Sequence, residues 1–143
     1  MSVDVYPDAL VREILKKVRT IAMIGASQNS MRPSHHVMAF LLSAGYRVIP
    51  VNPGHAGEIM QGERVYGRLA DIAEPVDMVD VFRASDHLMA VVDEVLAMRP
   101  TPSVIWAQLG VVDPAAAQKA EAAGLTMIMN RCPAIEYPRL ITL

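Results

Sequence analysis

The sequence has little cysteine, few aromatic residues and no strong excess of charge of either sign. Its single cysteine, Cys132, cannot form an internal disulfide, so we expect a reducing compartment and a cytoplasmic protein. With a net charge of −2, the chain lacks the positive field that attracts nucleic acid or an anionic membrane. No apolar run approaches the roughly 20 residues of a membrane-spanning helix, and the N-terminal residues lack the apolar core of a signal peptide. We therefore expect a soluble domain.

The apolar residues that are present are enough for one substantial core. The chain has 143 residues, of which 52% are hydrophobic, and we expect a single domain over residues 1–143. Short runs typical of buried strands alternate with segments of helical periodicity. The strand-like runs cover residues 20–24, 47–51, 78–81, 103–107 and 125–129, and the helical patterns cover 8–18, 34–42, 85–96 and 114–123.

This alternation predicts an α/β fold. We expect three layers built on a doubly wound, mainly parallel sheet of about five strands. The tail, residues 130–143, contains two prolines and is expected to be irregular. Sheets of this kind bind ligands beyond the carboxyl ends of their strands, where the strand order reverses. The residues that follow each apolar run are therefore the candidate site residues.

The segment after the first strand-like run has the features of an anion-binding loop. It reads GASQNSMRPS, from Gly25 to Ser34, and leads into a predicted helix. Small residues let the backbone approach a ligand, and the start of a helix offers free N–H groups and a positive dipole end. Ser27, Ser30 and Ser34 add hydroxyl donors, and the Arg32 guanidinium can pair with a phosphate. The alternative is an ordinary strand-to-helix connection with Ser34 as the helix cap.

The second strand-like run ends in Val51-Asn52-Pro53, without an acidic residue. A dinucleotide-binding domain usually has an acid there for the ribose hydroxyls, and its first loop follows a G-x-G-x-x-G pattern that this chain lacks. The missing acid favours a nucleotide whose ribose carries a 2′- or 3′-phosphate over NAD. The alternative is that Asn52-Pro53 forms only a turn.

Further candidates follow the third and fourth runs. Phe82 can pack against an adenine or an apolar arm, and Arg83 can neutralise a phosphate. Gln108 can form a hydrogen bond to an amide-bearing ligand, Leu109 follows it directly, and Gly110 allows the ligand to approach the backbone closely. The alternatives are a core Phe82, a solvent-exposed Arg83 and a simple glycine-containing turn.

Signals for catalysis or metal binding are weak. No spacing of His, Cys and Asp matches a zinc site, and scattered histidines with a lone Cys132 do not establish a nucleophile and base. We interpret Asp77 and Asp80 as strand-edge or capping residues. We therefore predict neither catalytic nor metal-binding residues.

Five segments, in this order along the chain, together resemble a known family. They are IAMIGASQNSMRPSHHV, GYRVIPVNP, VDMVDVFR, VIWAQLGV and AEAAGLTMIMNRCPAIEYPRL. The set resembles the small stand-alone coenzyme A-binding proteins, which are similar to the coenzyme A-binding domain of the succinyl-CoA synthetase alpha subunit. The resemblance covers residues 21–140 and implies a Rossmann-like domain that binds coenzyme A.

The resemblance also implies roles for the candidate residues. The pyrophosphate would be held by Gly25, Ala26, Ser27, Ser30, Arg32 and Ser34, the adenosine would lie against Val51, Asn52 and Pro53, and the pantetheine arm would follow Phe82, Arg83, Gln108, Leu109 and Gly110. The chain has no second domain with a phosphohistidine loop and no ATP-grasp partner, so ligase activity is not implied.

Three functions are consistent with the sequence. We expect a non-catalytic carrier, sensor or regulatory module for coenzyme A or an acyl-CoA. The alternatives are a coenzyme A-binding subunit of an acyl-CoA synthetase that needs a separate ATP-binding chain, and an NAD(P)-binding redox domain. The sequence does not decide whether the protein forms a homo-oligomer. Cys132 could form a mixed disulfide with coenzyme A, and the alternative is that it is a buried, inert cysteine.

Overall fold

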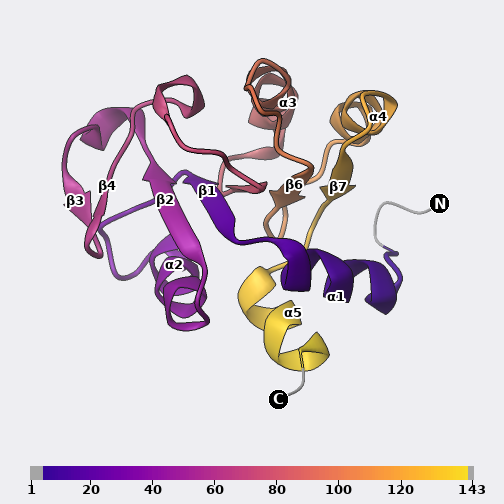
Figure 1. Cartoon of the computed structure of the whole chain (residues 1–143), viewed down its shortest axis with the longest axis horizontal. Helices are drawn as coiled ribbons and strands as arrows, with labels where there is room; N and C mark the ends of the chain where they lie inside the picture. The colour runs from indigo at the N-terminus through magenta and orange to yellow at the C-terminus, as the bar shows by residue number, and fades with distance from the viewer. Residues whose placement is uncertain (1–4, 142–143) are drawn as a thin grey trace.

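A five-stranded parallel sheet runs through the middle of the computed structural model, which describes residues 5–141 (Figure 1). Its strands lie in the order β2 (Arg47–Val51), β1 (Thr20–Ile24), β5 (Met78–Val81), β6 (Val104–Ala107) and β7 (Thr126–Ile128). Every neighbouring pair is parallel. The chain passes outward from β1 to β2 and then returns across β1 to β5, so the strand order reverses beside β1. The predicted doubly wound, Rossmann-like α/β fold is confirmed.

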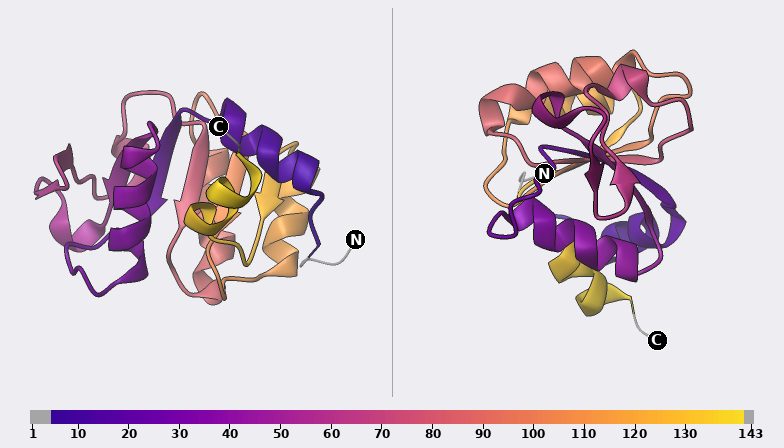
Figure 2. Two further views of the ribbon diagram at one scale, coloured as in Figure 1. Left: turned by 90° about the horizontal axis from the view of Figure 1, so that it is seen from below. Right: turned by 90° about the vertical axis from the view of Figure 1, so that its left-hand side faces the viewer.

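Helices cover both faces of the sheet (Figures 1 and 2). One layer contains α1 (Asp8–Lys17), α2 (Pro33–Ser43) and α5 (Pro133–Leu140), and the other contains α3 (Leu88–Leu96) and α4 (Pro114–Ala122). The connection from β2 to β5 carries the short turns η1 (Pro53–His55) and η2 (Leu69–Asp71) and a small hairpin of β3 (Ile59–Met60) and β4 (Glu63–Arg64). A third short turn, η3 (Ser85–His87), precedes α3.

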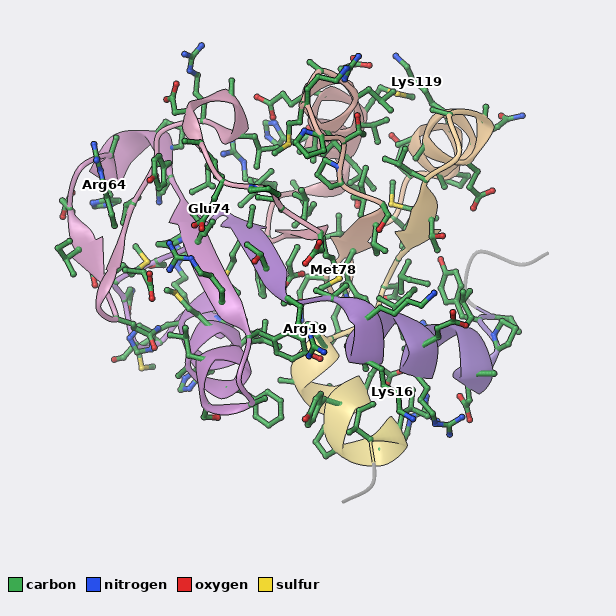
Figure 3. The ribbon with its side chains drawn as sticks, viewed as in Figure 1. Lys16, Arg19, Arg64, Glu74, Met78 and Lys119 are labelled. Atoms are coloured by element: carbon green, nitrogen blue, oxygen red, sulfur yellow. The ribbon has the colours of Figure 1, made fainter. Side chains whose placement is uncertain are left out.

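Alternation of side chains along each strand produces two cores. In β1, Ile21 and Met23 pack with the α1, α2 and α5 layer, whereas Ala22 and Ile24 pack with the α3 and α4 layer. Both faces of the sheet are therefore buried, which explains why the strands read as nearly continuous apolar runs. Figure 3 shows the side chains that fill both layers, with the fully buried Met78 on the central strand and the exposed Lys16 and Lys119 at the outside.

Two predictions of local structure were wrong, and the end of the first helix differs by one residue. Residues 133–140 of the tail form α5, because Pro133 occupies the first turn, where no backbone donor is needed. Ser34 is not a cap: α2 begins at Pro33, and Ser34 lies buried in its first turn. The first helix ends at Lys17, with Val18 as its C-terminal cap. Residues 142–143 of the tail lie outside the described residues.

Candidate ligand-binding site

A cavity of about 480 Å³ opens at the carboxyl edge of the sheet, where the strand order reverses. The loops after β1, β2, β5 and β6 and the first turn of α2 surround it. Its wall consists of Gly25, Ala26, Ser27, Arg32, Pro33, Ser34, Asn52, Phe82, Arg83, Gln108, Leu109 and Val111. Four segments that are far apart in the sequence therefore meet at one site, as the position of the strand-order reversal predicts.

Most of the predicted site residues lie in this wall, and four do not. Ser30 is exposed in the loop before α2, Val51 is buried at the end of β2, Pro53 begins η1, and Gly110 lies in the turn after β6. Two wall residues were missed, Pro33 and Val111. Each directly adjoins predicted residues, but an apolar side chain in the first turn of a helix or in a loop carries no signal of its own for a site.

Gly25 joins the loop after β1 to the strands on both sides. Its N–H donates to the carbonyl of Val51 at 3.1 Å, and its φ of +83° lies in the left-handed region that favours glycine. A Cβ at this position would stand 3.0 Å from the carbonyl carbon of Phe82 and closer still to its oxygen. The backbone of the loop can therefore approach the end of β5 only because this residue has no side chain.

The loop from Ser27 to Arg32 is held by its own hydrogen bonds. The Asn29 N–H donates to the Ser27 Oγ at 3.0 Å, the Met31 N–H to the Asn29 Oδ1 at 2.9 Å, and the Arg32 N–H to the Asn29 carbonyl at 3.0 Å. The N–H groups of Ser27 and Ser34, both in the cavity wall, have no partner within residues 5–141. Free N–H groups at the start of a helix are typical of an anion site.

The charged groups of the wall are all positive. Arg32 and Arg83 are its ionised side chains, and no carboxylate lines it. Neither guanidinium has an ion-pair partner among the described residues, whereas Arg47, Arg68 and Arg139 each pair with a carboxylate. Unpaired arginines beside a helix N-terminus favour an anionic ligand with several negative charges.

Asn52 ties two loops of the site together. Its Nδ2 donates to the Ala26 carbonyl at 2.9 Å, and its Oδ1 accepts the Gly54 N–H at 2.9 Å and caps η1. The turn that was considered as the alternative is therefore present, and the same residue also lines the cavity. No acidic side chain from the end of β2 lies in the wall.

The β6 side of the cavity has a different character. Gln108 is only 6% exposed, and its buried Oε1 has no hydrogen-bond partner within the described part of the chain. Phe82 is half-buried, and Leu109 is exposed at the cavity edge. A buried acceptor without a donor is costly. The arrangement therefore suits a ligand that is apolar along its length and carries an N–H or O–H donor.

The two aspartates near β5 have different roles. The Asp77 Oδ2 accepts the N–H groups of Arg19 and Thr20, each at 2.9 Å, as predicted for a capping residue. Asp80 lies inside β5 between Met23 and Trp106, is fully buried, and has no hydrogen-bond partner among the described residues, so its interpretation as an edge or capping residue was wrong. Burial raises the pKa of the Asp80 carboxyl well above its usual value. The nearby N–H of Val81 opposes this rise in pKa without reaching hydrogen-bond geometry.

Other reactive groups do not gather at the site. Cys132 is buried, with 7% of its surface exposed. Among residues 5–141, no group of three or more His, Cys, Asp or Glu side chains is placed to hold a metal ion. In the same part of the chain, every helix is too short or too polar to cross a membrane.

Comparison with known proteins identifies the family. A family model described as a CoA binding domain matches residues 19–138. The chain belongs to this family. It is 38% identical over 124 residues to the uncharacterized protein YneT of Bacillus subtilis (strain 168), a match that covers 87% of this chain and 89% of YneT.

Solved structures confirm the fold of this CoA binding domain. A Thermus thermophilus protein described as cell-free ID.343 has 40% sequence identity and a TM-score of 0.89, with 95% of this chain and all of that chain covered. A dinucleotide-forming acetyl-coenzyme A synthetase 1 of Ca. Korarchaeum cryptofilum has a TM-score of 0.63 at 22% identity, over 76% of this chain and 25% of the synthetase. The second likeness is one of fold.

Proposed function

We propose that this chain binds coenzyme A or an acyl-CoA in the cavity at the carboxyl edge of the sheet. The observation that carries the proposal is the wall itself: it contains two arginines without an ion-pair partner among the described residues, Arg32 at the start of α2 and Arg83 after β5, and no carboxylate. Membership of the CoA binding domain family supports the same ligand. Coenzyme A combines a diphosphate and a ribose 3′-phosphate with a long, weakly polar arm. The cavity wall likewise contains arginines and a helix start that suit phosphates, and apolar residues that suit the arm.

Different residues in and beside the wall would bind three parts of the ligand. The diphosphate would be held by the backbone of Gly25 to Ser27 and by Arg32 and Ser34, with Ser30 at the outer side of the loop. The adenosine would lie toward Asn52 and its neighbours Val51 and Pro53, where the absence of an acid admits a ribose phosphate. The pantetheine arm would follow Phe82, Arg83 and the turn from Gln108 to Gly110.

The buried Gln108 Oε1 provides a test of fit for the arm. This acceptor needs a donor, and the pantetheine arm carries secondary amide N–H groups. The apolar surfaces of Phe82 and Leu109 lie next to it in the wall. A nucleotide without such an arm would occupy the phosphate end of the cavity and leave the Gln108 acceptor unpaired.

We infer a non-catalytic role as carrier, sensor or regulatory module. The cavity wall contains no carboxylate, histidine or cysteine that could act as base or nucleophile. This composition supports binding without chemistry by this chain. The acyl group that is bound, and any partner protein, would then depend on which protein supplies or receives the ligand.

Calorimetric titration tests the binding proposal. Coenzyme A and dephospho-CoA are titrated separately into the purified protein, up to about 1 mM ligand, which still detects weak affinities. We expect both to bind and dephospho-CoA to bind more weakly, because it lacks the 3′-phosphate. Absence of heat for both ligands would remove the proposal.

A second candidate function is that of a coenzyme A-binding subunit of an acyl-CoA synthetase. The likeness of fold to the Ca. Korarchaeum cryptofilum synthetase favours it, since this chain spans only 25% of that protein. It predicts copurification with a separate ATP-binding chain and acyl-CoA formation only when both chains are mixed. If no such mixture forms acyl-CoA, the role as a separate coenzyme A-binding module remains.

The NAD(P) alternative is tested by measuring the fluorescence of NADPH as the protein is titrated into it.

A further inference from the structure

The turn after β6 is held by side chains from two other parts of the fold. The Gly110 N–H donates to the Asn130 Oδ1 at 2.8 Å, and the Gly110 carbonyl accepts from the Ser85 Oγ at 3.2 Å. The same Ser85 Oγ accepts the Val112 N–H at 2.9 Å. Asn130 follows β7, and Ser85 begins η3. Both polar groups of Gly110 are therefore bound by side chains that lie outside the cavity wall.

Gly110 is exposed and has open space where a side chain would stand. Its φ is +81°, and no atom lies within 4 Å of the position that a Cβ would occupy. The turn is exposed at Leu109 and Gly110. The ends of the turn, Gln108 and Val111, are buried, and the Gln108 N–H donates to the Val81 carbonyl at 3.1 Å. The exposed middle of the turn is held by the hydrogen bonds from Asn130 and Ser85 and by the bond from the Val111 N–H to the Gln108 carbonyl.

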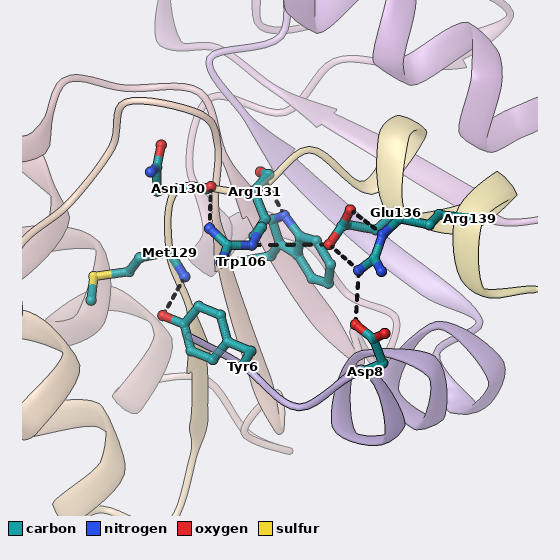
Figure 4. A network of polar contacts seen from close by, with 8 residues as sticks. All are labelled: Tyr6, Asp8, Trp106, Met129, Asn130, Arg131, Glu136 and Arg139. Carbon is teal, nitrogen blue, oxygen red and sulfur yellow. Dashed lines mark hydrogen bonds and ion pairs between the residues drawn. The ribbon is translucent and has the colours of Figure 1, made fainter. Parts of the chain in front are cut away.

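Asn130 is itself fixed on both sides. Its φ of +59° is the left-handed conformation that asparagine tolerates better than most residues. Figure 4 shows the surrounding contacts, which tie residues 129–131 to Tyr6 before α1, to β6 and to α5. They are Met129 N–H to Tyr6 Oη at 2.9 Å, Arg131 Nη1 to the Asn130 carbonyl at 2.8 Å, Trp106 Nε1 to the Arg131 carbonyl at 2.9 Å, and the ion pairs of Glu136 with Arg131 at 3.9 Å and with Arg139 at 3.0 Å. The acceptor offered to Gly110 is therefore held in a defined place.

We propose that Asn130 and Ser85 are positioning residues that set the site for the pantetheine arm. They do so by fixing the turn that brings Gln108, Leu109 and Val111 to the cavity. The inference rests on the proposed function and adds two residues to it. The part of the ligand that they control is the amide-bearing arm, because the Gln108 acceptor lies on this turn, whereas the phosphate loop after β1 has its own hydrogen bonds.

The test compares two ligands on variants of the full chain. The ligands are coenzyme A and adenosine 3′-phosphate 5′-diphosphate, which lacks the pantetheine arm. Asn130→Gly keeps the left-handed backbone accessible and removes the acceptor, and Ser85→Ala removes the hydroxyl. Each variant is expected to weaken coenzyme A binding by about three- to tenfold, the effect of one lost hydrogen bond, and to leave the affinity for the armless nucleotide within about twofold of the wild type.

Ser85→Thr is the matched control, because it keeps a hydroxyl at the same place and should restore coenzyme A affinity. Retained binding of the armless nucleotide shows that each variant is folded. Equal weakening for both ligands, or unchanged coenzyme A binding in Asn130→Gly and Ser85→Ala, would overturn the inference while the proposed function stands. If the wild-type protein binds neither ligand, the proposed function fails and the inference fails with it.

Discussion

The backbone carbonyl of Phe82 lies where the side chain of residue 25 would stand if that residue were not glycine. This contact brings the loop after β1 against the end of β5, and both form one wall of the cavity. This close approach lies beside the proposed diphosphate site. It also makes Gly25 the position where a single methyl group should have the largest effect.

Gly25→Ala is expected to destabilise the protein by about 2–4 kcal/mol, from left-handed strain and from the clash with backbone that cannot move away easily. Urea denaturation measures the change. Gly124→Ala is the matched control: its φ is +91°, yet no atom lies within 4 Å of the added Cβ, so only the strain of about 1–2 kcal/mol applies. Equal destabilisation by the two variants would contradict the role assigned to the Phe82 contact.

Arg32→Gln and Arg83→Gln are each expected to weaken coenzyme A binding by about tenfold or more, because each removes a positive charge from the wall of the cavity proposed to hold this anionic ligand. Calorimetry at low and high salt measures the affinity, and the salt dependence should decrease in both variants. Arg68→Gln removes an arginine that is paired with Asp71 outside the cavity wall. A loss in this control as large as in the two site variants would show that the effect is one of overall charge.

Asp80 should make the stability of the protein fall as the pH rises. Burial raises the pKa of this carboxyl in the folded state, so folding takes up a proton between the unfolded pKa of about 4 and the higher folded pKa. The free energy of unfolding then decreases by at most about 1.4 kcal/mol per pH unit, from the unfolded pKa up to the folded pKa.

Asp80→Asn removes this titration. The unfolding free energy of the variant, relative to that of the wild type, should therefore increase with pH. Urea denaturation at several pH values between 4 and 8 measures it. Parallel curves for the two proteins would show that the Asp80 carboxyl has the same pKa in the folded and unfolded chain.

Glu136→Gln is expected to destabilise the protein by about 2 kcal/mol. The Glu136 carboxylate is buried and pairs with Arg131, which precedes α5, and with Arg139 within α5, so the substitution leaves a buried site without the charge that both arginines face. Asp71→Asn breaks an exposed ion pair with Arg68 and should change stability by about 0.5 kcal/mol or less. Thermal unfolding compares the two. A Glu136→Gln protein as stable as Asp71→Asn would mean that the network in Figure 4 contributes little to stability.

The sequence was sufficient to predict the sheet because its strands are buried on both faces. The runs at 20–24, 47–51 and 78–81 coincide with β1, β2 and β5, since continuous apolar stretches bounded by glycine or polar residues leave few alternatives. Helix α5 was missed because its stability is not local. It contains two prolines, and contacts from distant residues, such as the pair of Arg139 with Asp8, hold it in place.

The position of the cavity was predictable, but the contacts that support its wall were not. The topological rule and the family resemblance together led to residues after β1, β2, β5 and β6, most of which line the cavity. Neither could indicate that Asn130 and Ser85 would bind the same glycine, since a hydrogen bond between loops depends on how the strands are stacked. The burial of Asp80 was hidden for a similar reason, because a carboxylate inside a strand looks like an edge residue until the sheet order is known.

A crystal structure of the protein grown with coenzyme A tests the central claim most directly. We expect the diphosphate at the backbone of Gly25 to Ser27 and the start of α2, with the pantetheine arm along Phe82 and an amide N–H donating to the Gln108 Oε1. Ordered coenzyme A at any other surface of the protein, with the cavity at the carboxyl edge left free, would contradict it.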